Sequence, residues 1–341
     1  QKTAYEIYQC DWSSDVCSSD LGGLGLPRLV VVTRLDRERA SMDRVLDALR
    51  RDCAREIVPI QLPIGEERQF GGVIDLVRMC ALTFNPDSTG RMSEGPIPDT
   101  LLPRATAARE ALIETVAETD ESLMERFFNE GTLTQEQLVQ GLKAGTTAGR
   151  IFPLVCTSGL RVIGAQPLLD AIVDYLPSPA ERTFPATSDT GAPSAVPADD
   201  RVSPLVFVWK TIADPFAGRI TLLRVVSGTV KSDSSLHNYS RDGVERLGHL
   251  LLLQGKTQLQ VPELHAGDLG AVAKLRDTRT SDILAEHPPT VRIEPIQFPE
   301  AVLSYAIEPK SRADEDKISS AMHRLEEEDP SIRYTRDPQT H

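Results

Sequence analysis

Hydrophobic and polar positions divide the chain into a first half that alternates strands with helices and a second half of short strands. Residues 26–32 (LPRLVVV) are rich in β-branched apolar side chains, which predicts a buried parallel strand. After Ser41, apolar residues recur at the three-to-four-residue spacing of a helix between Met42 and Leu49. A strand, a short loop and a helix in this order predict an α/β unit.

The same alternation continues to residue 175. Residues 56–83 contain several short apolar runs between turn residues, which predicts short strands, whereas residues 85–98 are rich in turn formers. Thr134 and Gln137 have the spacing of a capping box and predict the start of a helix. The other predicted elements of this half are helices at 105–118, 120–129 and 166–175 and a buried strand at 151–155.

The pattern changes after residue 177. Residues 177–200 are rich in Pro, Ala, Ser and Asp and have little to bury, so we place an interdomain linker at 181–202. Short strands without helices then predict a small closed β-barrel over 203–290. Its predicted strands are 205–212, 218–226, 228–231, 245–253 and 269–275.

The last segment, 291–341, mixes both kinds of pattern. We expect a strand at 302–307, a helix at 314–327 and a second strand at 332–335. Because a single βαβ unit leaves sheet edges unpaired, this segment is predicted to be the first half of a larger domain.

Residues 1–21 do not follow these patterns. QKTAYEI and DWSSDVCSSDL resemble translations of the constant parts of an indexed adaptor used in short-read DNA sequencing, and Tyr8 and Gln9 fall within its barcode. We therefore expect an adaptor-derived, disordered artefact at 1–21 and an authentic chain that starts near Gly22. A polar tail that belongs to the protein is the alternative.

Composition narrows the function classes. A net charge of −13 argues against bulk nucleic-acid binding, so we expect no DNA partner. No apolar run reaches the roughly 18–20 residues of a membrane span, and we expect no membrane association. Cys53, Cys80 and Cys156 are widely spaced outside the adaptor segment, which favours a reducing cytoplasm and predicts no metal site.

Several long blocks resemble bacterial elongation factor G, a translational GTPase. Residues 59–77 (PIQLPIGEERQFGGVIDLV) and 166–179 (QPLLDAIVDYLPSP) resemble its GTPase domain, and 213–230 (ADPFAGRITLLRVVSGTV) and 265–278 (HAGDLGAVAKLRDT) its second domain. Residues 306–340 resemble the opening of its third domain. The blocks HLLLLQGK and PEAVLSYAIEPKSRADEDKIS favour a divergent paralogue over the housekeeping protein.

This resemblance implies a multidomain fold of α/β plus β class. The implied order is a partial P-loop GTPase-type α/β domain at 22–180 with an inserted α+β subdomain at about 56–150, the linker at 181–202, the translation-factor β-barrel at 203–290, and the first βαβ of a ferredoxin-like domain at 291–341.

The resemblance also implies a guanine-binding loop. Thr33-Arg34-Leu35-Asp36 stands where the family has Asn-Lys-x-Asp, whose Asp accepts two hydrogen bonds from the guanine edge. Asp36 matches the Asp of the family motif. Thr33 stands in place of its Asn and lacks the side-chain amide, and Arg34 stands in place of its Lys. From the residues alone, a strand end with Asp36 capping the next turn remains an alternative.

Two further positions are implied by the same comparison. Thr157-Ser158-Gly159 stands where the family has Gly-Ser-Ala, so Ser158 and Gly159 are candidates to approach the guanine oxygen through backbone N–H groups. Arg219 is a candidate ribosome contact because the family's second domain faces ribosomal RNA, although a β-turn closed by a surface Arg is equally compatible.

No G-x-x-x-x-G-K-[ST] occurs in the chain. That loop cradles the phosphates and holds Mg²⁺, so we expect no catalytic residue, no metal ligand and no GTP hydrolysis from this chain alone. The cofactors implied for the intact parent are GTP or GDP with Mg²⁺.

The expected function is therefore that of a fragment of an elongation-factor-G-like GTPase, which promotes GTP-dependent ribosomal translocation in intact form. Its expected partners are ribosomal RNA and the ribosomal stalk proteins, the latter through the acidic stretch 110–130 unless that stretch is only a solvated charged face. We expect a cytoplasmic monomer. The alternatives are a ribosomal-protection or release-factor-type GTPase, or a ribosome-binding paralogue without GTPase activity.

Sequencing the genomic locus upstream of the codon for Gly22 tests the interpretation of residues 1–21. We expect the reading frame to continue into a strand followed by G-x-x-x-x-G-K-[ST] and then D-x-x-G. A genome that encodes all twenty-one residues behind a start codon would contradict the adaptor interpretation and favour a ribosome-binding module.

Overall fold

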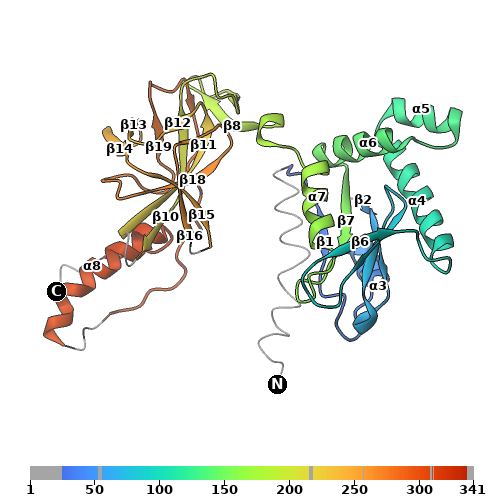
Figure 1. The fold of residues 1–341 in the computed structure, drawn as a ribbon. Helices are drawn as coiled ribbons and strands as arrows, with labels where there is room; N and C mark the ends of the chain where they lie inside the picture. The colour runs from blue at the N-terminus through green and yellow to red at the C-terminus, as the bar shows by residue number, and fades with distance from the viewer. Residues whose placement is uncertain are drawn as a thin grey trace. The chain divides into compact units, whose positions relative to one another are not determined.

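The computed structural model describes residues 25–52, 56–214, 218–255, 257–307, 309 and 311–335. The predictions for residues 1–21 and for Cys53 lie outside these residues. The chain forms two compact units, unit 1 (Gln1–Ser178) and unit 2 (Pro179–His341), and each is described by itself (Figure 1).

Unit 1 is built on a three-stranded parallel sheet in the order β1-β7-β2. Its strands are β1 (Val30–Val32), β2 (Glu56–Pro59) and β7 (Ile151–Cys156). Helix α3 (Met42–Asp52) follows β1, which confirms the predicted α/β unit. Every residue of β7 is buried, because the central strand of a parallel sheet is covered on both faces and needs a continuous apolar run.

An α+β subdomain is inserted between β2 and β7. Its antiparallel sheet has the order β3-β4-β5-β6. The elements of the subdomain are β3 (Gln61–Ile64), β4 (Gly72–Asp75), β5 (Cys80–Phe84), β6 (Met92–Gly95), α4 (Leu102–Ala117), α5 (Glu121–Glu130) and α6 (Gln135–Thr147). Strand β6 lies within residues 85–98, where only turns were expected, because its mostly exposed side chains carry no apolar alternation.

Local contacts set where these helices begin and how closely they pack. The Thr134 hydroxyl accepts the Gln137 N–H at 3.3 Å, and the Gln137 side chain accepts the Thr134 N–H at 2.9 Å, so the predicted capping box is confirmed. The carboxylate of Asp120 caps α5 in the same way. A Cβ on Gly141 would lie 2.5 Å from the Val116 side chain, so glycine allows α6 to approach α4.

Unit 2 is dominated by an eight-stranded antiparallel sheet in the order β14-β13-β19-β10-β11-β18-β15-β16. Its strands are β10 (Leu205–Asp214), β11 (Gly218–Ser227), β13 (Ser234–Asn238), β14 (Gly243–Leu247), β15 (Leu250–Gln254), β16 (Thr257–Val261), β18 (Leu269–Ala273) and β19 (Ile283–Ala285). The strand predicted at 245–253 is two strands, β14 and β15, and the sequence pattern missed β13, β16 and β19.

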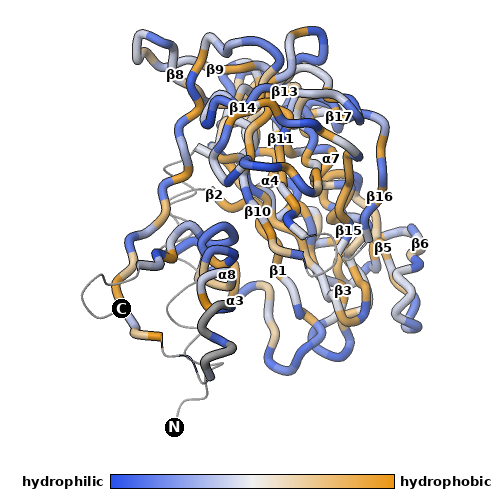
Figure 2. Tube along the Cα trace, turned by 90° about the vertical axis from the view of Figure 1, so that its left-hand side faces the viewer, coloured by the Kyte–Doolittle hydropathy of each residue, from blue (hydrophilic) through white to orange (hydrophobic). Residues whose placement is uncertain are grey.

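This sheet curls around one core without full closure. Leu236 and Leu247 from one end of the sheet pack in the same cluster as Leu250 from the other end. The end strands β14 and β16 are not paired with each other in the described part of the chain, so the predicted closed barrel is an incompletely closed one. A small ladder of β12 (Val230–Lys231) with β17 (Glu263–Leu264) lies beside it. Hydrophobic stretches of the trace lie mostly on strands, and the connections are mostly hydrophilic (Figure 2).

The linker expected at 181–202 is wrong for most of its length. Strands β8 (Thr183–Ser188) and β9 (Pro193–Pro197) form an antiparallel hairpin, and β20 (Val291–Arg292) pairs with β8. Phe184 and Val196 pack against Phe207 on the outer face of the large sheet. Few apolar residues suffice here because the hairpin has only one face to bury.

The tail also differs from the expectation. Helix α8 (Arg312–Glu328) forms, but the predicted strands at 302–307 and 332–335 do not. A strand needs a hydrogen-bonded partner, and the described residues place none beside either segment. Val302 and Tyr305 are accordingly 92% and 84% exposed.

Leu138→Ala tests the contribution of α6 to unit 1. Leu138 is fully buried, so the truncation leaves a cavity and should lower the free energy of unfolding by about 2–5 kcal/mol. Urea unfolding followed by circular dichroism measures the change. Leu160→Ala is the matched control because Leu160 is 81% exposed, and it should shift stability by less than about 0.5 kcal/mol. Equal effects of the two substitutions would contradict the packing.

Candidate functional site

The two segments expected to bind guanine lie at the same edge of the unit 1 sheet. Strand β1 pairs in parallel with β7, and Val32 stands opposite Cys156 at the ends of the two strands. The Thr157 N–H donates to the Val32 carbonyl at 2.8 Å, and the Leu35 N–H donates to the Thr157 carbonyl at 3.4 Å. The loops that follow the two strands, 33–36 and 157–159, are therefore held side by side.

The loop 33–36 is a tight turn with one residue in the left-handed region. Arg34 has φ 62°, and the Arg37 N–H donates to the Arg34 carbonyl at 3.1 Å. A non-glycine residue held in that region costs about 1–3 kcal/mol, which the surrounding structure must offset. Leu35 is buried and anchors the turn, whereas Thr33 and Arg34 are exposed.

Asp36 lies half-buried at this turn. Its carboxylate has no hydrogen-bond partner in the described part of the chain, and the α3 cap is the Ser41 hydroxyl, which accepts the Arg44 N–H at 3.5 Å. The alternative in which Asp36 caps the next turn is therefore wrong. Two carboxylate oxygens remain available to accept hydrogen bonds from a ligand.

The structure separates the roles of Ser158 and Gly159. Ser158 is buried, its N–H donates to the Ile163 carbonyl at 2.9 Å, and its hydroxyl accepts the Arg161 N–H at 3.3 Å. The exposed Gly159 N–H has no acceptor among the described residues. Ser158 is thus committed to shaping the loop, and Gly159 has the free donor.

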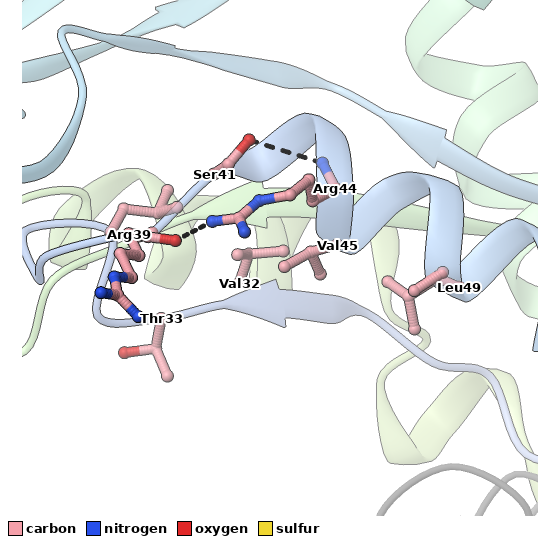
Figure 3. A pocket seen from close by; sticks show the side chains of 10 residues that line it. Val32, Thr33, Arg39, Ser41, Arg44, Val45 and Leu49 are labelled. Atoms are coloured by element: carbon pink, nitrogen blue, oxygen red, sulfur yellow. Dashed lines mark hydrogen bonds between the residues drawn. The ribbon is translucent and has the colours of Figure 1, made fainter.

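A cavity of about 430 Å³ lies between β1 and α3, beside these loops. Val32, Thr33 and Val45 line it, together with Ser41 and Arg44 from the start of the helix (Figure 3). The Arg44 guanidinium donates to the Arg39 carbonyl across its mouth. Asp36, Ser158 and Gly159 do not line this cavity, so it borders the candidate base site without containing it.

Arg219, the candidate ribosome contact, points into unit 2. Its side chain is only 18% exposed and pairs with Glu327 of α8 at 3.2 Å. The same guanidinium donates to the carbonyls of Leu275 and Arg276. Arg219 thus ties β11 to the loop after β18 and to α8 through three of its five N–H donors.

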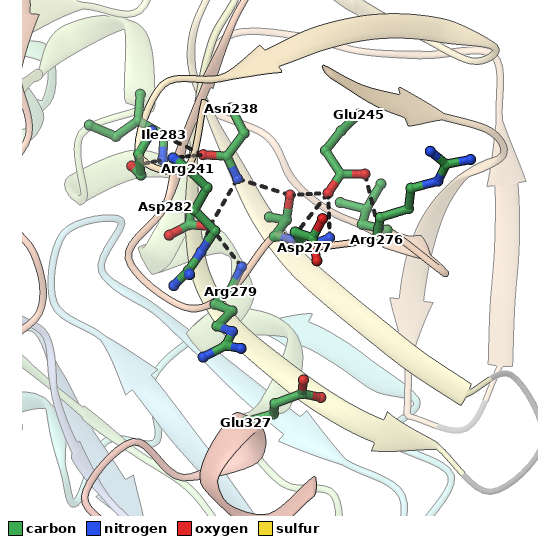
Figure 4. Close-up of polar contacts among 12 residues, drawn as sticks. Asn238, Arg241, Glu245, Arg276, Asp277, Arg279, Asp282, Ile283 and Glu327 are labelled. Atoms are coloured by element: carbon green, nitrogen blue, oxygen red, sulfur yellow. Dashed lines mark hydrogen bonds and ion pairs between the residues drawn. The ribbon is translucent and has the colours of Figure 1, made fainter. Parts of the chain in front are cut away.

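Glu245 organises the same loop from the other side. It is 4% exposed, and its carboxylate accepts the N–H groups of Arg276, Asp277 and Thr278 at 2.9–3.0 Å and the Thr278 hydroxyl at 2.8 Å (Figure 4). Burial alone raises the pKa of Glu245, but these donated hydrogen bonds outweigh it and lower the pKa below its usual 4.5.

A second buried carboxylate continues this network. Asp282 accepts from the Asn238 amide at 2.9 Å, the Arg241 Nε at 2.8 Å and the Arg279 N–H at 2.9 Å. The Asn238 amide also donates to the Thr278 hydroxyl at 3.1 Å. Sequence reasoning missed both carboxylates, because neither Glu245 on β14 nor Asp282 just before β19 differs in local sequence from an exposed acid.

The described residues contain neither a cluster of metal-binding side chains nor a membrane-spanning helix. No group of three or more His, Cys, Asp or Glu side chains among them is arranged to hold a metal ion. None of their helices is both long enough and apolar enough to span a membrane.

Comparisons with known proteins agree with this architecture. Residues 204–287 match the family model for elongation factor G domain 2, and residues 298–341 match that for elongation factor G domain III. A crystal structure of a protein from Thermus thermophilus is similar over 94% of this chain and 46% of that chain, with 32% identity and a TM-score of 0.79. The chain thus spans about half the length of that protein.

Fold and comparisons together define a chain of the translation elongation factor class. It carries the second and third domains of elongation factor G, within an elongation-factor-G-like fold, as the sequence blocks predicted.

Glu245→Gln tests the loop anchor. The substitution removes the charge that three backbone N–H groups share, and it should destabilise unit 2 by about 1–3 kcal/mol at pH 7. Because the folded pKa is lowered, the stability from Glu245 is complete above pH 4.5 and is lost as pH falls through the folded pKa.

Urea unfolding followed by the fluorescence of Trp209, in a Trp12→Phe background, measures both effects. The wild type should lose stability between neutral and acidic pH more steeply than the variant. Glu286→Gln, at an exposed position of the same unit, is the control and should leave the pH dependence unchanged. A Glu245→Gln variant with the wild-type pH profile would contradict the anchor.

Proposed function

We propose that this chain supplies the base-recognition loops and the ribosome-facing domains of a GTP-dependent translation factor that promotes ribosomal translocation. The observation that carries the proposal is the pairing of β1 with β7, which brings the Asp36 turn beside Gly159. These two places offer an unpaired carboxylate and an unpaired N–H donor in the described part of the chain.

The chemistry of this pair fits guanine. Guanine presents two adjacent N–H donors to the Asp36 carboxylate and a carbonyl oxygen to the Gly159 N–H. Adenine lacks both the donor pair and the oxygen, so it would leave Asp36 unpaired at a cost of about 1–3 kcal/mol. Arg34 offers a guanidinium plane for stacking on the base, whereas Thr33 provides no amide to brace the loop.

Phosphate binding and GTP hydrolysis are proposed for the intact protein and not for this chain alone. The chain's sequence has no G-x-x-x-x-G-K-[ST] loop, and its described residues hold no group of three or more His, Cys, Asp or Glu side chains arranged for a metal ion. GTP or GDP is therefore proposed as the cofactor through its base alone, and hydrolysis and Mg²⁺ binding are proposed for other parts of the protein.

The ribosome is the proposed partner, in the cytoplasm, and the chain is proposed to act as a monomer without DNA or membrane contacts. The exposed acidic face of α4 and α5 is the part proposed to meet stalk proteins. Its exposed carboxylates are Glu110, Glu114, Glu118, Glu121, Glu125 and Glu130, and Phe128 on α5 is 78% exposed. Arg219 remains a proposed RNA contact only through its two remaining N–H donors, because three of its five donors bond to Glu327, Leu275 and Arg276.

A second candidate is a ribosome-binding paralogue without GTPase activity. Thr33 and Arg34 favour it, since both depart from the Asn-Lys pair that completes guanine recognition in the family. A ribosomal-protection or release-factor role would share the same domains.

Nucleotide competition on the Asp36→Asn variant separates these candidates. The wild type should prefer guanine to adenine nucleotides by about 10- to 100-fold, because only guanine satisfies the carboxylate. An Asn side chain offers one donor and one acceptor, which matches xanthine, so the variant should lose guanine and gain xanthine nucleotides.

Displacement of a fluorescent guanine nucleotide measures the preference, first on this chain and then on its genomic full-length form. Asp43→Asn is the control, because Asp43 lies on α3 and does not face the base loops. Equal binding of guanine and adenine nucleotides by the full-length wild type would overturn the proposal and support the binding paralogue.

A further inference from the structure

A second cleft in unit 1 has no part in base recognition. Its volume is about 320 Å³, and it lies where the inserted subdomain meets α7 (Ala165–Tyr175). Residues of β3, β4, β5, α6 and α7 line it, and none of residues 33–36 or 157–159 does. The cleft therefore needs an explanation that is independent of nucleotide binding.

Two nearly buried polar side chains in this cleft have no partner for one polar group. Tyr175 is 6% exposed, and its hydroxyl makes no hydrogen bond with the described residues. Gln61 is 3% exposed; its amide oxygen accepts the Cys156 N–H at 3.1 Å, but its amide nitrogen has no acceptor among the same residues. Neither group is sealed inside the protein, so both are reachable from the cleft.

Water in the cleft satisfies both groups, so a ligand that displaces this water must replace its hydrogen bonds. Burial, reinforced by the charges of Asp75 and Asp174, raises the pKa of the Tyr175 hydroxyl, which stays protonated at neutral pH. The hydroxyl can donate or accept, whereas the Gln61 nitrogen can only donate. A ligand that satisfies both must carry a hydrogen-bonding oxygen.

The carboxylates that line the cleft differ in whether they already have a partner. Asp75 is already neutralised, because it accepts the Val77 and Arg78 N–H groups at 2.9 Å and pairs with the Arg78 guanidinium at 3.0 Å. Asp170 and Asp174 stand one helical turn apart at the rim on α7, exposed and without an ion pair among the described residues. The rim therefore favours a cation.

Much of the remaining lining of the cleft is apolar. Ile60, Leu82, Val139, Pro167 and Ala171 line it together with the two carboxylates and the two unpaired groups. An alkyl stem fits such a wall and is stabilised by the apolar area that it removes from water.

We propose that this cleft binds a small amino alcohol, with its ammonium group between Asp170 and Asp174, its alkyl stem on the apolar wall, and its hydroxyl against Tyr175 and Gln61. The hydroxyl oxygen accepts from the Gln61 nitrogen and shares a hydrogen bond with the Tyr175 hydroxyl. An anion is repelled at the rim, and a plain alkylamine leaves the two deep groups unpaired.

Two probes that differ only in the hydroxyl test this site, 5-amino-1-pentanol and pentylamine. Methyl NMR of the labelled chain at low ionic strength locates each probe through the signals of Ile60, Val139 and Ala171. We expect both probes to shift these signals, with the amino alcohol binding about three- to tenfold more tightly.

Tyr175→Phe removes only the hydroxyl and leaves the ring in place. It should weaken the amino alcohol about three- to tenfold and leave pentylamine unchanged. Asp174→Asn, at an exposed position, should weaken both probes about two- to fivefold, and added salt should do the same. Unchanged thermal unfolding of each variant verifies that the fold is intact.

The control is the double variant Glu121→Gln/Glu125→Gln, which removes an exposed pair of carboxylates with the same spacing on α5. It should leave both affinities unchanged. Three results would overturn the proposal: cleft methyl signals that do not move, shifts spread over the acidic surface that the control variant reduces, or equal weakening of both probes by Tyr175→Phe. None of these results depends on whether the base loops bind nucleotide.

Discussion

Unit 1 depends on the burial of β7 between two parallel neighbours. All six residues of this strand are buried, and its ladders hold β1 on one side and β2 on the other. Parallel strands place their carboxyl ends at one edge, so this pairing alone brings residues 33–36 next to 157–159 across more than 120 positions of sequence. The inserted subdomain fills the interval between the end of β2 and the start of β7.

Unit 2 is organised differently, around buried charge rather than buried apolar surface alone. Glu245 and Asp282 have little contact with water, and an unpaired carboxylate there would cost several kcal/mol. Each accepts three or more hydrogen bonds, and together they fix the loop that Arg219 holds from its other side. These hydrogen bonds hold that loop against the incompletely closed barrel.

The family assignment and the proposed guanine recognition rest on different observations. The family follows from domain matches and a shared fold, whereas guanine recognition rests on a few side chains at one sheet edge. In the proposed site Asp36 supplies the carboxylate for the base, and Thr33 and Arg34 stand where the resembled family has Asn and Lys. The pairing of β1 with β7 uses backbone groups, so it does not depend on the side chains at positions 33 and 34.

The sequence by itself determined the elements whose signals are local. Neighbouring residues are enough to recognise the N-terminal caps at Asp120 and Thr134 and the buried apolar run of β7. The same is true of the sequence blocks that match the family. Tertiary structure alone decided the features that depend on distant partners. The hairpin of β8 and β9 packs on the surface that Phe207 provides. Arg219 points inward because Glu327 and two backbone carbonyls accept hydrogen bonds from its guanidinium. Ser158 and Gly159 look equivalent in a loop, but only the cross-loop bond to Ile163 assigns one to structure and leaves the other free. Long-range contacts of this kind leave no periodic pattern in the sequence, so only the tertiary structure shows them.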